Sequence, residues 1–209
     1  MSAPNINKEV KKAVDALLHV QRRVLPIKVG NEAINLFKDN FMEGGFFGQT
    51  WPEPIRRKLS FNGARGQYGT LQSGSSHLMR SFEKDIKTPG RVVIRNPVEY
   101  AAIHNDGGTI TVTAKMKRYF MAKFIETKRS MSLTKVRKKL SRNKYNRGLS
   151  REAQFYLAMA HKQEGSQIRM PKRRFMGNHP VLQKKINDII YNELKKFIED
   201  YGRNIGTAR

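Results

Sequence analysis

The chain has 209 residues, of which 41 are Lys or Arg and 17 are Asp or Glu, so its formal net charge at pH 7 is +24. This charge argues against an ordinary metabolic enzyme and indicates an acidic partner, while a hydrophobic fraction of 38% is enough for one compact core. The absence of cysteine excludes a disulfide framework, a thiol nucleophile and a thiolate metal site.

No stretch approaches the roughly 18 consecutive apolar residues that a membrane helix needs, and the first ten residues lack the apolar core of a secretory signal. We therefore expect a soluble protein made in the cytoplasm, with no membrane partner.

Two amphipathic helices are expected at the start of the chain. Residues 6–25 place Val10, Val14 and Leu17 at spacings of three and four, and residues 28–42 repeat the helical period. Pro26 ends the first helix or starts the second, and Gly44 with Gly45 supplies a left-handed termination.

Residues 46–76 show neither the helical nor the strand period, which predicts a long irregular segment held by its one tryptophan, Trp51. The β-branched run 92–94 predicts a strand that stops at Pro97. The apolar residues 100–103, the turn signal at 105–108 and the alternating residues 109–113 predict an antiparallel pair with a glycine-rich bend.

Residues 115–151 hold fourteen Lys or Arg and a single acidic residue, Glu126. Beyond them we expect a helix around 153–159, a strand at 167–170 and a long helix over 180–201 that Gly202 ends. Leu182, Ile186, Ile190 and Leu194 lie on one apolar stripe of that helix, which is suited to cover a small sheet.

Reactive chemistry has little support. His104, Asn105 and Asp106 form the best local candidate for a metal or acid–base site, but a polar turn explains them as well, and a nuclease would need further carboxylates. The loop 69–75 resembles a phosphate-binding loop in composition only, because it lacks the Gly-Lys-Ser/Thr ending. We therefore expect no catalytic residue, no metal and no cofactor.

The basic segment is the strongest electrostatic feature, because like charges at this density repel one another unless an anion compensates them. Its aromatic residues suit stacking on single-stranded nucleic acid, but Phe120 and Phe124 also fall on a helical core face with Met116, Met121 and Ile125. The candidate contacts to nucleic acid or to an acidic partner are Lys128, Arg129, Lys135, Arg137, Lys138, Lys139, Arg142, Lys144 and Arg147.

Several short motifs follow one another between about residues 29 and 182. They include Gly44-Gly45-Phe46, Trp51-Pro52, Ser73-Gly74, the block from Tyr100-Ala101-Ala102 through His104 to Gly107-Gly108, and Pro171 with Phe175 and Gly177. Their order resembles that of the phage virion morphogenesis proteins, which are Mu-like tail-completion or head–tail joining proteins.

This resemblance implies a structural virion protein with a small α/β fold and no catalysis. It implies a homo-oligomeric ring at the head–tail junction or tail of the virion, assembled in the host cytoplasm, with portal, connector, tail-tube or other neck proteins as partners and packaged DNA in the channel as a further candidate. The residues that it marks as structural are Trp51, Pro52, Gly74, Tyr100, Ala101, His104, Gly107, Gly108, Pro171, Phe175 and Gly177.

The expected fold is α+β, with a small, mostly antiparallel sheet packed by a long C-terminal helix, N-terminal helices and a basic extended insertion. The expected organisation is an N-terminal helical arm over 1–27, one core formed by 28–114 and 152–202, the insertion 115–151 and a tail 203–209. The alternative function is a non-specific nucleic-acid-binding protein that uses residues 115–151, and a metal-dependent nuclease at His104 is a distant third.

Overall fold

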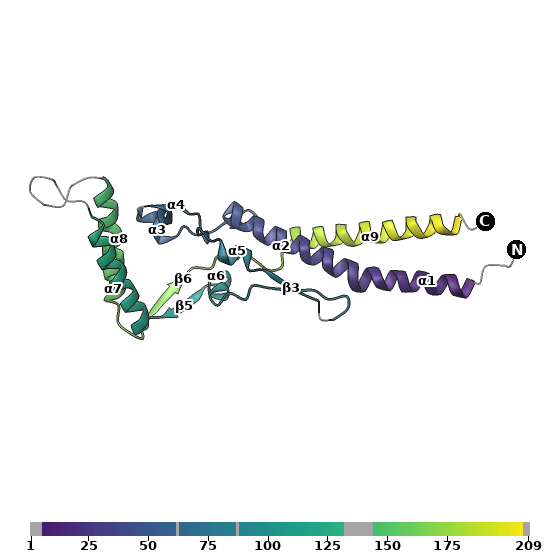
Figure 1. Ribbon diagram of the computed structural model, residues 1–209, viewed down its shortest axis with the longest axis horizontal. Coiled ribbons are helices and arrows are strands. Elements are labelled where there is room, and N and C mark those ends of the chain that lie inside the picture. Colours follow the sequence, from purple (N-terminus) through teal and green to yellow (C-terminus); the bar gives the residue numbers. More distant parts are fainter. Residues whose placement is uncertain (1–5, 62, 87, 132–143, 207–209) are drawn as a thin grey trace, which may run out of the picture. The chain divides into compact units, whose positions relative to one another are not determined.

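The computed structural model describes residues 6–61, 63–86, 88–131 and 144–206. Within this part of the chain the predicted α+β class is confirmed, and the strands form three antiparallel two-stranded sheets rather than one (Figure 1). The described residues belong to two compact units, the first drawn from Met1–Met42, Met79–Val98 and Phe175–Arg209, and the second from Glu43–Leu78 and Glu99–Arg174. The predicted core of 28–114 with 152–202 stays a prediction.

The first unit begins with α1 (Ile6–His19), which leads through a single π-helical segment, Val20–Val24, into α2 (Leu25–Glu43). Pro26 is the second residue of α2 and has no amide hydrogen to donate to the preceding turn. The π-helical turn lies directly before this proline, where a backbone hydrogen bond of a regular α-helix would be missing. The wider turn accommodates the missing bond, and the helix continues through the proline. Gly44 follows α2 with a φ of 71°, which is the left-handed termination predicted from the sequence.

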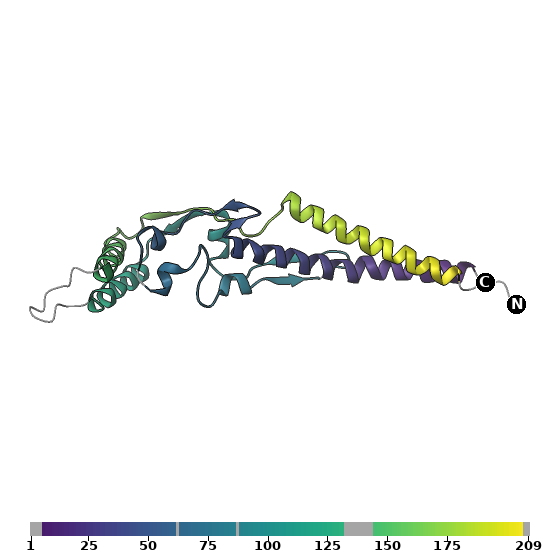
Figure 2. The same cartoon turned by 90° about the horizontal axis from the view of Figure 1, so that it is seen from above.

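The C-terminal helix α9 (Pro180–Gly206) runs antiparallel to α1 and α2 within the first unit (Figures 1 and 2). Lys28 of α2 pairs with Glu193 of α9, and the Tyr201 hydroxyl donates to the carbonyl oxygen of Glu9 at 2.6 Å. Helix α9 is longer than predicted, because Gly202 lies inside it. A glycine inside a helix costs only about 1 kcal/mol, which is too little to end a helix of this length.

An aromatic cluster forms the core of the first unit. Phe37 and Phe41 of α2 contact Phe82, and Phe41 and Phe82 both contact Phe175, with ring centroids between 5.1 and 6.2 Å apart. Phe82 directly precedes β3 (Glu83–Asp85), which pairs antiparallel with β4 (Val93–Arg95). The strand predicted at 92–94 is therefore confirmed to within one residue.

The irregular segment predicted for 46–76 is confirmed in its main feature, since it contains only very short elements. The strands β1 (Gly45–Phe46) and β2 (Gln49–Thr50) form a two-residue antiparallel pair. Single helical turns follow at α3 (Ile55–Lys58), α4 (Ala64–Gln67) and α5 (His77–Arg80).

The predicted pairing of residues 100–103 with 109–113 is wrong. Residues 101–106 form helix α6 (Ala101–Asp106), and β5 (Gly108–Thr111) pairs antiparallel with β6 (Gln167–Met170) in the register Ile110–Ile168. Consecutive alanines favour a helix, and Gly107 ends that helix with a φ of 74°. The glycine-rich bend therefore joins a helix to a strand instead of two strands.

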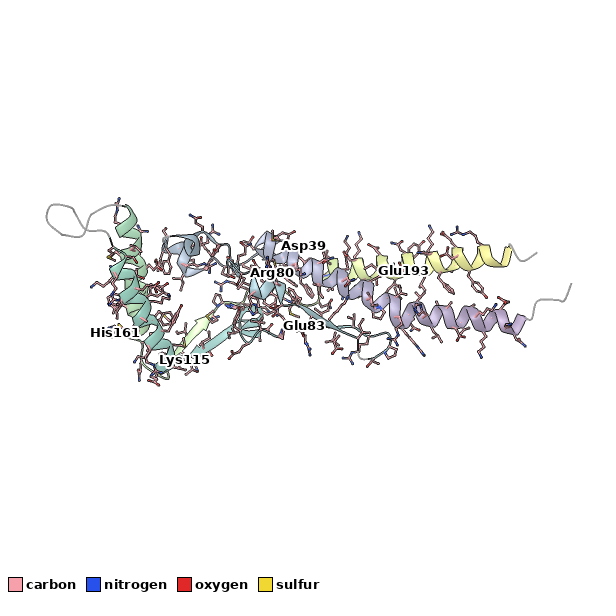
Figure 3. The ribbon with its side chains drawn as sticks, viewed as in Figure 1. Asp39, Arg80, Glu83, Lys115, His161 and Glu193 are labelled. Atoms are coloured by element: carbon pink, nitrogen blue, oxygen red, sulfur yellow. The ribbon has the colours of Figure 1, made fainter. Side chains whose placement is uncertain are left out.

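The basic insertion is also different from the prediction, because its described residues are helical and not extended. Helix α7 (Ala114–Arg129) starts at Thr113, whose side chain caps it by accepting a hydrogen bond from the amide of Met116 at 3.2 Å. Helix α8 (Lys144–Ala160) lies antiparallel beside α7, and both views show the two helices as a hairpin (Figures 1 and 2). Figure 3 shows Lys115 and His161 at the same end of it.

Gly107 offers a test of this bend. Its φ of 74° and ψ of −172° define a conformation that is almost exclusive to glycine, and an added Cβ would lie 2.9 Å from the backbone nitrogen of Lys172. We expect Gly107→Ala to lower the free energy of unfolding by more than about 3 kcal/mol, through backbone strain and overpacking together. Chemical denaturation of the wild type and the variant measures this loss in the free energy of unfolding.

Gly165→Ala is the matched control, because Gly165 also has a positive φ, of 82°, but nothing lies within 4 Å of its added Cβ. Gly165→Ala should lower the free energy of unfolding by about 1–2 kcal/mol. Equal losses in the two variants would contradict the close approach of Lys172.

Candidate functional site

Three segments that are distant in sequence meet in the second unit, and residues of the predicted motifs lie in each of them. The Trp51 indole Nε1 donates to the carbonyl oxygen of Arg174 at 2.6 Å. Arg173 donates from its backbone nitrogen to the carbonyl oxygen of His104 at 2.8 Å, and from Nε to the carbonyl oxygen of Pro52 at 3.0 Å. The segment after β6 is thus bonded both to the Trp51-Pro52 turn and to helix α6.

The other motif residues lie in buried positions, in ring contacts or at bends of the chain. Ala101 is buried, while Tyr100 is exposed and its ring lies edge-on to His104 at 5.8 Å. An added Cβ on Gly108 would lie 2.9 Å from Cδ1 of Ile103. Gly74 is exposed and Pro171 half-buried in the second unit, whereas Phe175 and Gly177 belong to the first unit.

Phe175 is fully buried in the first unit, as the sequence predicts for a core residue. Its ring contacts Phe41 and Phe82, and its carbonyl oxygen accepts a hydrogen bond from the buried Asn40 amide at 3.1 Å. The motif that ends the resemblance therefore contributes to both units, with Arg173 and Arg174 in one and Phe175 in the other.

Two arginines stabilise backbone carbonyl groups of the second unit. Nη2 of Arg56 lies 2.6 Å from the carbonyl oxygen of Gly69, 3.2 Å from that of Tyr68 and 3.3 Å from that of Gln72. Burial lowers the pKa of Arg56 and that of the buried Arg173. The positive charge of Arg56 lowers the pKa of Arg173 further. Neither arginine stands out in the sequence, because the role of each depends on loop carbonyl groups whose positions only the fold sets.

His104 is the one residue of the predicted metal or acid–base candidate with an unusual environment. Its Nδ1 is buried and has no hydrogen-bond partner among the described atoms. Burial lowers the pKa of His104 below its ordinary value of 6.5, and the positive charge of Arg173 lowers it further. Both effects favour the neutral form of the imidazole.

Asn105 and Asp106, the other two residues of that candidate, contact each other. The Asn105 amide donates to the carboxylate of Asp106 at 2.8 Å, and the Asp106 side chain is exposed. In the part of the chain that the structure describes, no three or more His, Cys, Asp or Glu side chains are grouped to hold a metal ion.

Of the nine basic residues predicted as contacts, Lys128, Arg129 and Arg147 have described side chains, and all three are exposed. Lys135, Arg137, Lys138, Lys139 and Arg142 lie outside the described residues, and Lys144 is described only as the start of α8. Three more exposed cations on the hairpin, Lys115, Arg118 and Arg151, were not in the predicted set.

An apolar surface of the first unit was not predicted as a site. We define the apolar seam as the exposed side chains of Val10, Val14 and Leu17 on α1 with Tyr191, Leu194 and Ile198 on α9. Leu17 and Leu194 line one groove with a volume of about 590 Å³. The heptad-like spacing within each helix is visible in the sequence, but that spacing also suits a buried face, and only the fold shows which side chains stay exposed.

Comparisons of this chain with protein-family models, with curated proteins and with solved structures found no match. Among the described helices, none combines the length and apolar character that crossing a membrane requires.

Trp51 allows the bond across the second unit to be tested. The side chain is 6% exposed, so Trp51→Ala should lower the free energy of unfolding by about 3–5 kcal/mol. Trp51→Phe keeps most of the apolar contact but removes the hydrogen-bond donor to the Arg174 carbonyl group. This variant should lower the free energy of unfolding by about 1–3 kcal/mol. Met42→Ala, at a side chain of α2 that is 72% exposed and not part of the apolar seam, is the control and should lower the free energy of unfolding by less than about 0.5 kcal/mol. A loss that small for Trp51→Ala would show that the indole is not buried.

His104 should make stability depend on pH. Because its pKa is lowered in the folded state, the unfolded chain binds the proton first as the pH falls through 6.5, so stability is present above that pH and decreases below it. Unfolding of the wild type and His104→Asn between pH 7.5 and 5.5 should show a smaller acid loss in the variant. His161→Asn, at an exposed histidine, should behave like the wild type. Identical pH profiles for His104→Asn and wild type would contradict the lowered pKa.

Proposed function

We propose that this protein is a non-enzymatic structural subunit of a phage virion, which assembles as a ring and acts in tail completion or as a head–tail connector. The observation that carries the proposal is the apolar seam. Val10 and Val14 are 55% and 50% exposed, and Tyr191 and Ile198 are 67% and 68% exposed. Leu17 and Leu194 line the same groove, which places the two helices' exposed stripes beside it. Exposed large apolar groups that lie close together are typical of a protein–protein contact.

The spacing of these side chains suits a helical partner. Val10, Val14 and Leu17 are separated by four and three residues, as are Ile198, Leu194 and Tyr191 on α9. Side chains at this spacing form a narrow stripe that packs into the matching stripe of another helix. A second copy of the chain offers two such stripes, one on α1 and one on α9.

Charge favours this surface over the basic hairpin for self-association. Helix α1 carries three basic and two acidic residues, and α9 carries five basic and four acidic ones, so both are close to neutral. Two copies can approach along these helices without the repulsion that like-charged hairpins would cause. In such an assembly, one surface of each copy would contact a different surface of the next copy. The copies form a closed ring when the rotation from each copy to the next adds up to a full turn.

The ordered motifs that resemble the phage virion morphogenesis proteins also support the proposal. Within them, Trp51, Pro52 and His104 bond to residues 173 and 174 and so shape the second unit. Such a protein functions through the surfaces that it presents to neighbouring copies and to neck or tail proteins. The alternative, a non-specific nucleic-acid-binding protein, requires no self-association through the seam.

The oligomeric state tests this function. We expect light scattering at tens of micromolar to show a discrete oligomer and negative-stain microscopy to show rings. The double variant Val14→Lys and Ile198→Lys should be monomeric, because each side chain contributes about 1.5–3 kcal/mol when buried, so each contact weakens at least about 100-fold.

Val93→Lys is the control, because Val93 is an exposed valine on β4 that is not part of the seam. This variant should assemble like the wild type. A wild-type protein that stays monomeric, or a seam variant that still forms rings, would contradict the proposal.

A further inference from the structure

The α7–α8 hairpin presents six exposed cations in its described part. They are Lys115, Arg118, Lys128 and Arg129 on α7 and Arg147 and Arg151 on α8. Apart from Lys128, which lies over the Phe124 ring at 5.4 Å from its centroid, none of them has an ion pair or ring contact with another described residue. Their charges therefore face solvent without a compensating anion from the described part of the chain.

The two carboxylates of the hairpin are already engaged. Glu126 forms an ion pair with Lys123 at 2.6 Å. Glu152 is buried and accepts a hydrogen bond from the Tyr156 hydroxyl at 3.0 Å. The net charge of the exposed side chains on the described part of the hairpin is consequently positive, and it attracts an anion.

Three aromatic residues of the hairpin, Phe120, Phe155 and Tyr156, pack against one another. Phe120 contacts Phe155 and Tyr156, with ring centroids 6.3 and 6.2 Å apart, and Phe61 contacts the same two rings at 5.6 and 5.8 Å. Tyr119 is the large aromatic side chain that stays exposed among the described residues of the hairpin. Single-strand binding needs several exposed rings on which bases stack, and this arrangement supplies one.

The exposed cations of α7 lie towards its two ends, at Lys115 and Arg118 and at Lys128 and Arg129, so a partner that contacts both ends has to extend along the helix. The stretch of α7 from Arg118 to Arg129 covers about 17 Å at ~1.5 Å of rise per residue. Duplex DNA carries one negative charge per ~1.7 Å of its axis, so about ten phosphates lie along that length. A protein partner with an acidic surface would also need large apolar side chains on the hairpin as anchors. The described part of the hairpin exposes two, Tyr119 and Ile125, against six cations.

We propose that the exposed cations of the α7–α8 hairpin bind the phosphate backbone of duplex DNA, with Phe120, Phe155 and Tyr156 serving as the core of the hairpin and not as a stacking platform. This binding goes beyond the proposed assembly function and does not depend on the apolar seam.

The test is binding of the full chain to a random-sequence 30-base-pair duplex across a salt series, followed by fluorescence anisotropy. Each cation that contacts a phosphate adds about 0.9 to the magnitude of the slope of log K against log salt. Replacing Arg118, Arg129, Arg147 and Arg151 together by Gln should therefore reduce that magnitude by about 3 to 4. These side chains are exposed, so circular dichroism and the Tm should stay close to the wild type.

The control replaces Arg22, Arg23, Arg80 and Arg91 by Gln, which removes the same residue type and the same charge from exposed positions of the first unit. We expect its slope to change by less than about 1. Equal reductions in the two variants, or a reduction below about 2 in the hairpin variant, would show that net charge and not the hairpin binds DNA, and would overturn the proposal.

Two competitors separate duplex DNA from other acidic partners. A single strand of the same length should bind no more tightly than the duplex, and Tyr119→Ala should leave duplex affinity within twofold of the wild type. Tighter binding of the single strand, or displacement of the duplex by polyglutamate at equal charge concentration, would overturn the assignment to duplex phosphates.

The seam variant should retain the wild-type salt slope per monomer, so loss of ring formation and loss of DNA binding are distinguishable.

Discussion

The hydrogen bonds of residues 173 and 174 are the interaction on which the second unit depends. This segment follows strand β6, and it bonds to the Trp51-Pro52 turn through the Arg173 guanidinium and the Arg174 carbonyl group, and to helix α6 through the Arg173 amide. These bonds hold together the Trp51-Pro52 turn, which lies among very short elements, and helix α6. They also bring the Lys172 backbone against Gly107, where only a glycine fits, so the helix–strand bend and the tryptophan turn are set by the same few residues.

The excess of positive charge is the second constraint, and the fold handles it in two ways. Arg56 and Arg173 are taken into the second unit, where backbone carbonyls accept their hydrogen bonds. The cations of α7 and α8 are instead placed on the outside of an aromatic-centred hairpin. Helices α1 and α9 carry nearly balanced charge and expose apolar groups. The described part of the chain therefore presents two chemically different surfaces, one apolar and nearly neutral and one cationic.

The helical elements and the buried aromatic residues could be predicted from local signals. The period of residues 6–25 and 28–42, the left-handed Gly44 and the β-branched run before Pro97 were sufficient for α1, α2 and β4. Trp51 and Phe175 were correctly placed in the interior. The pairing of β5 was not predictable in the same way. Its partner β6 is more than fifty residues away, and the predicted adjacent hairpin was displaced by α6, which buries Ala101.

The sequence by itself determined the α+β class, the amphipathic helices and the concentration of positive charge in residues 115–151, because each of these depends on composition or on periodicity over a few turns. Only the tertiary structure decided which cations face solvent, that Phe120 packs with Phe155 and Tyr156, and that the apolar groups of α1 and α9 stay exposed. Those outcomes depend on which segments meet, and long-range contact is a property of the whole folded chain.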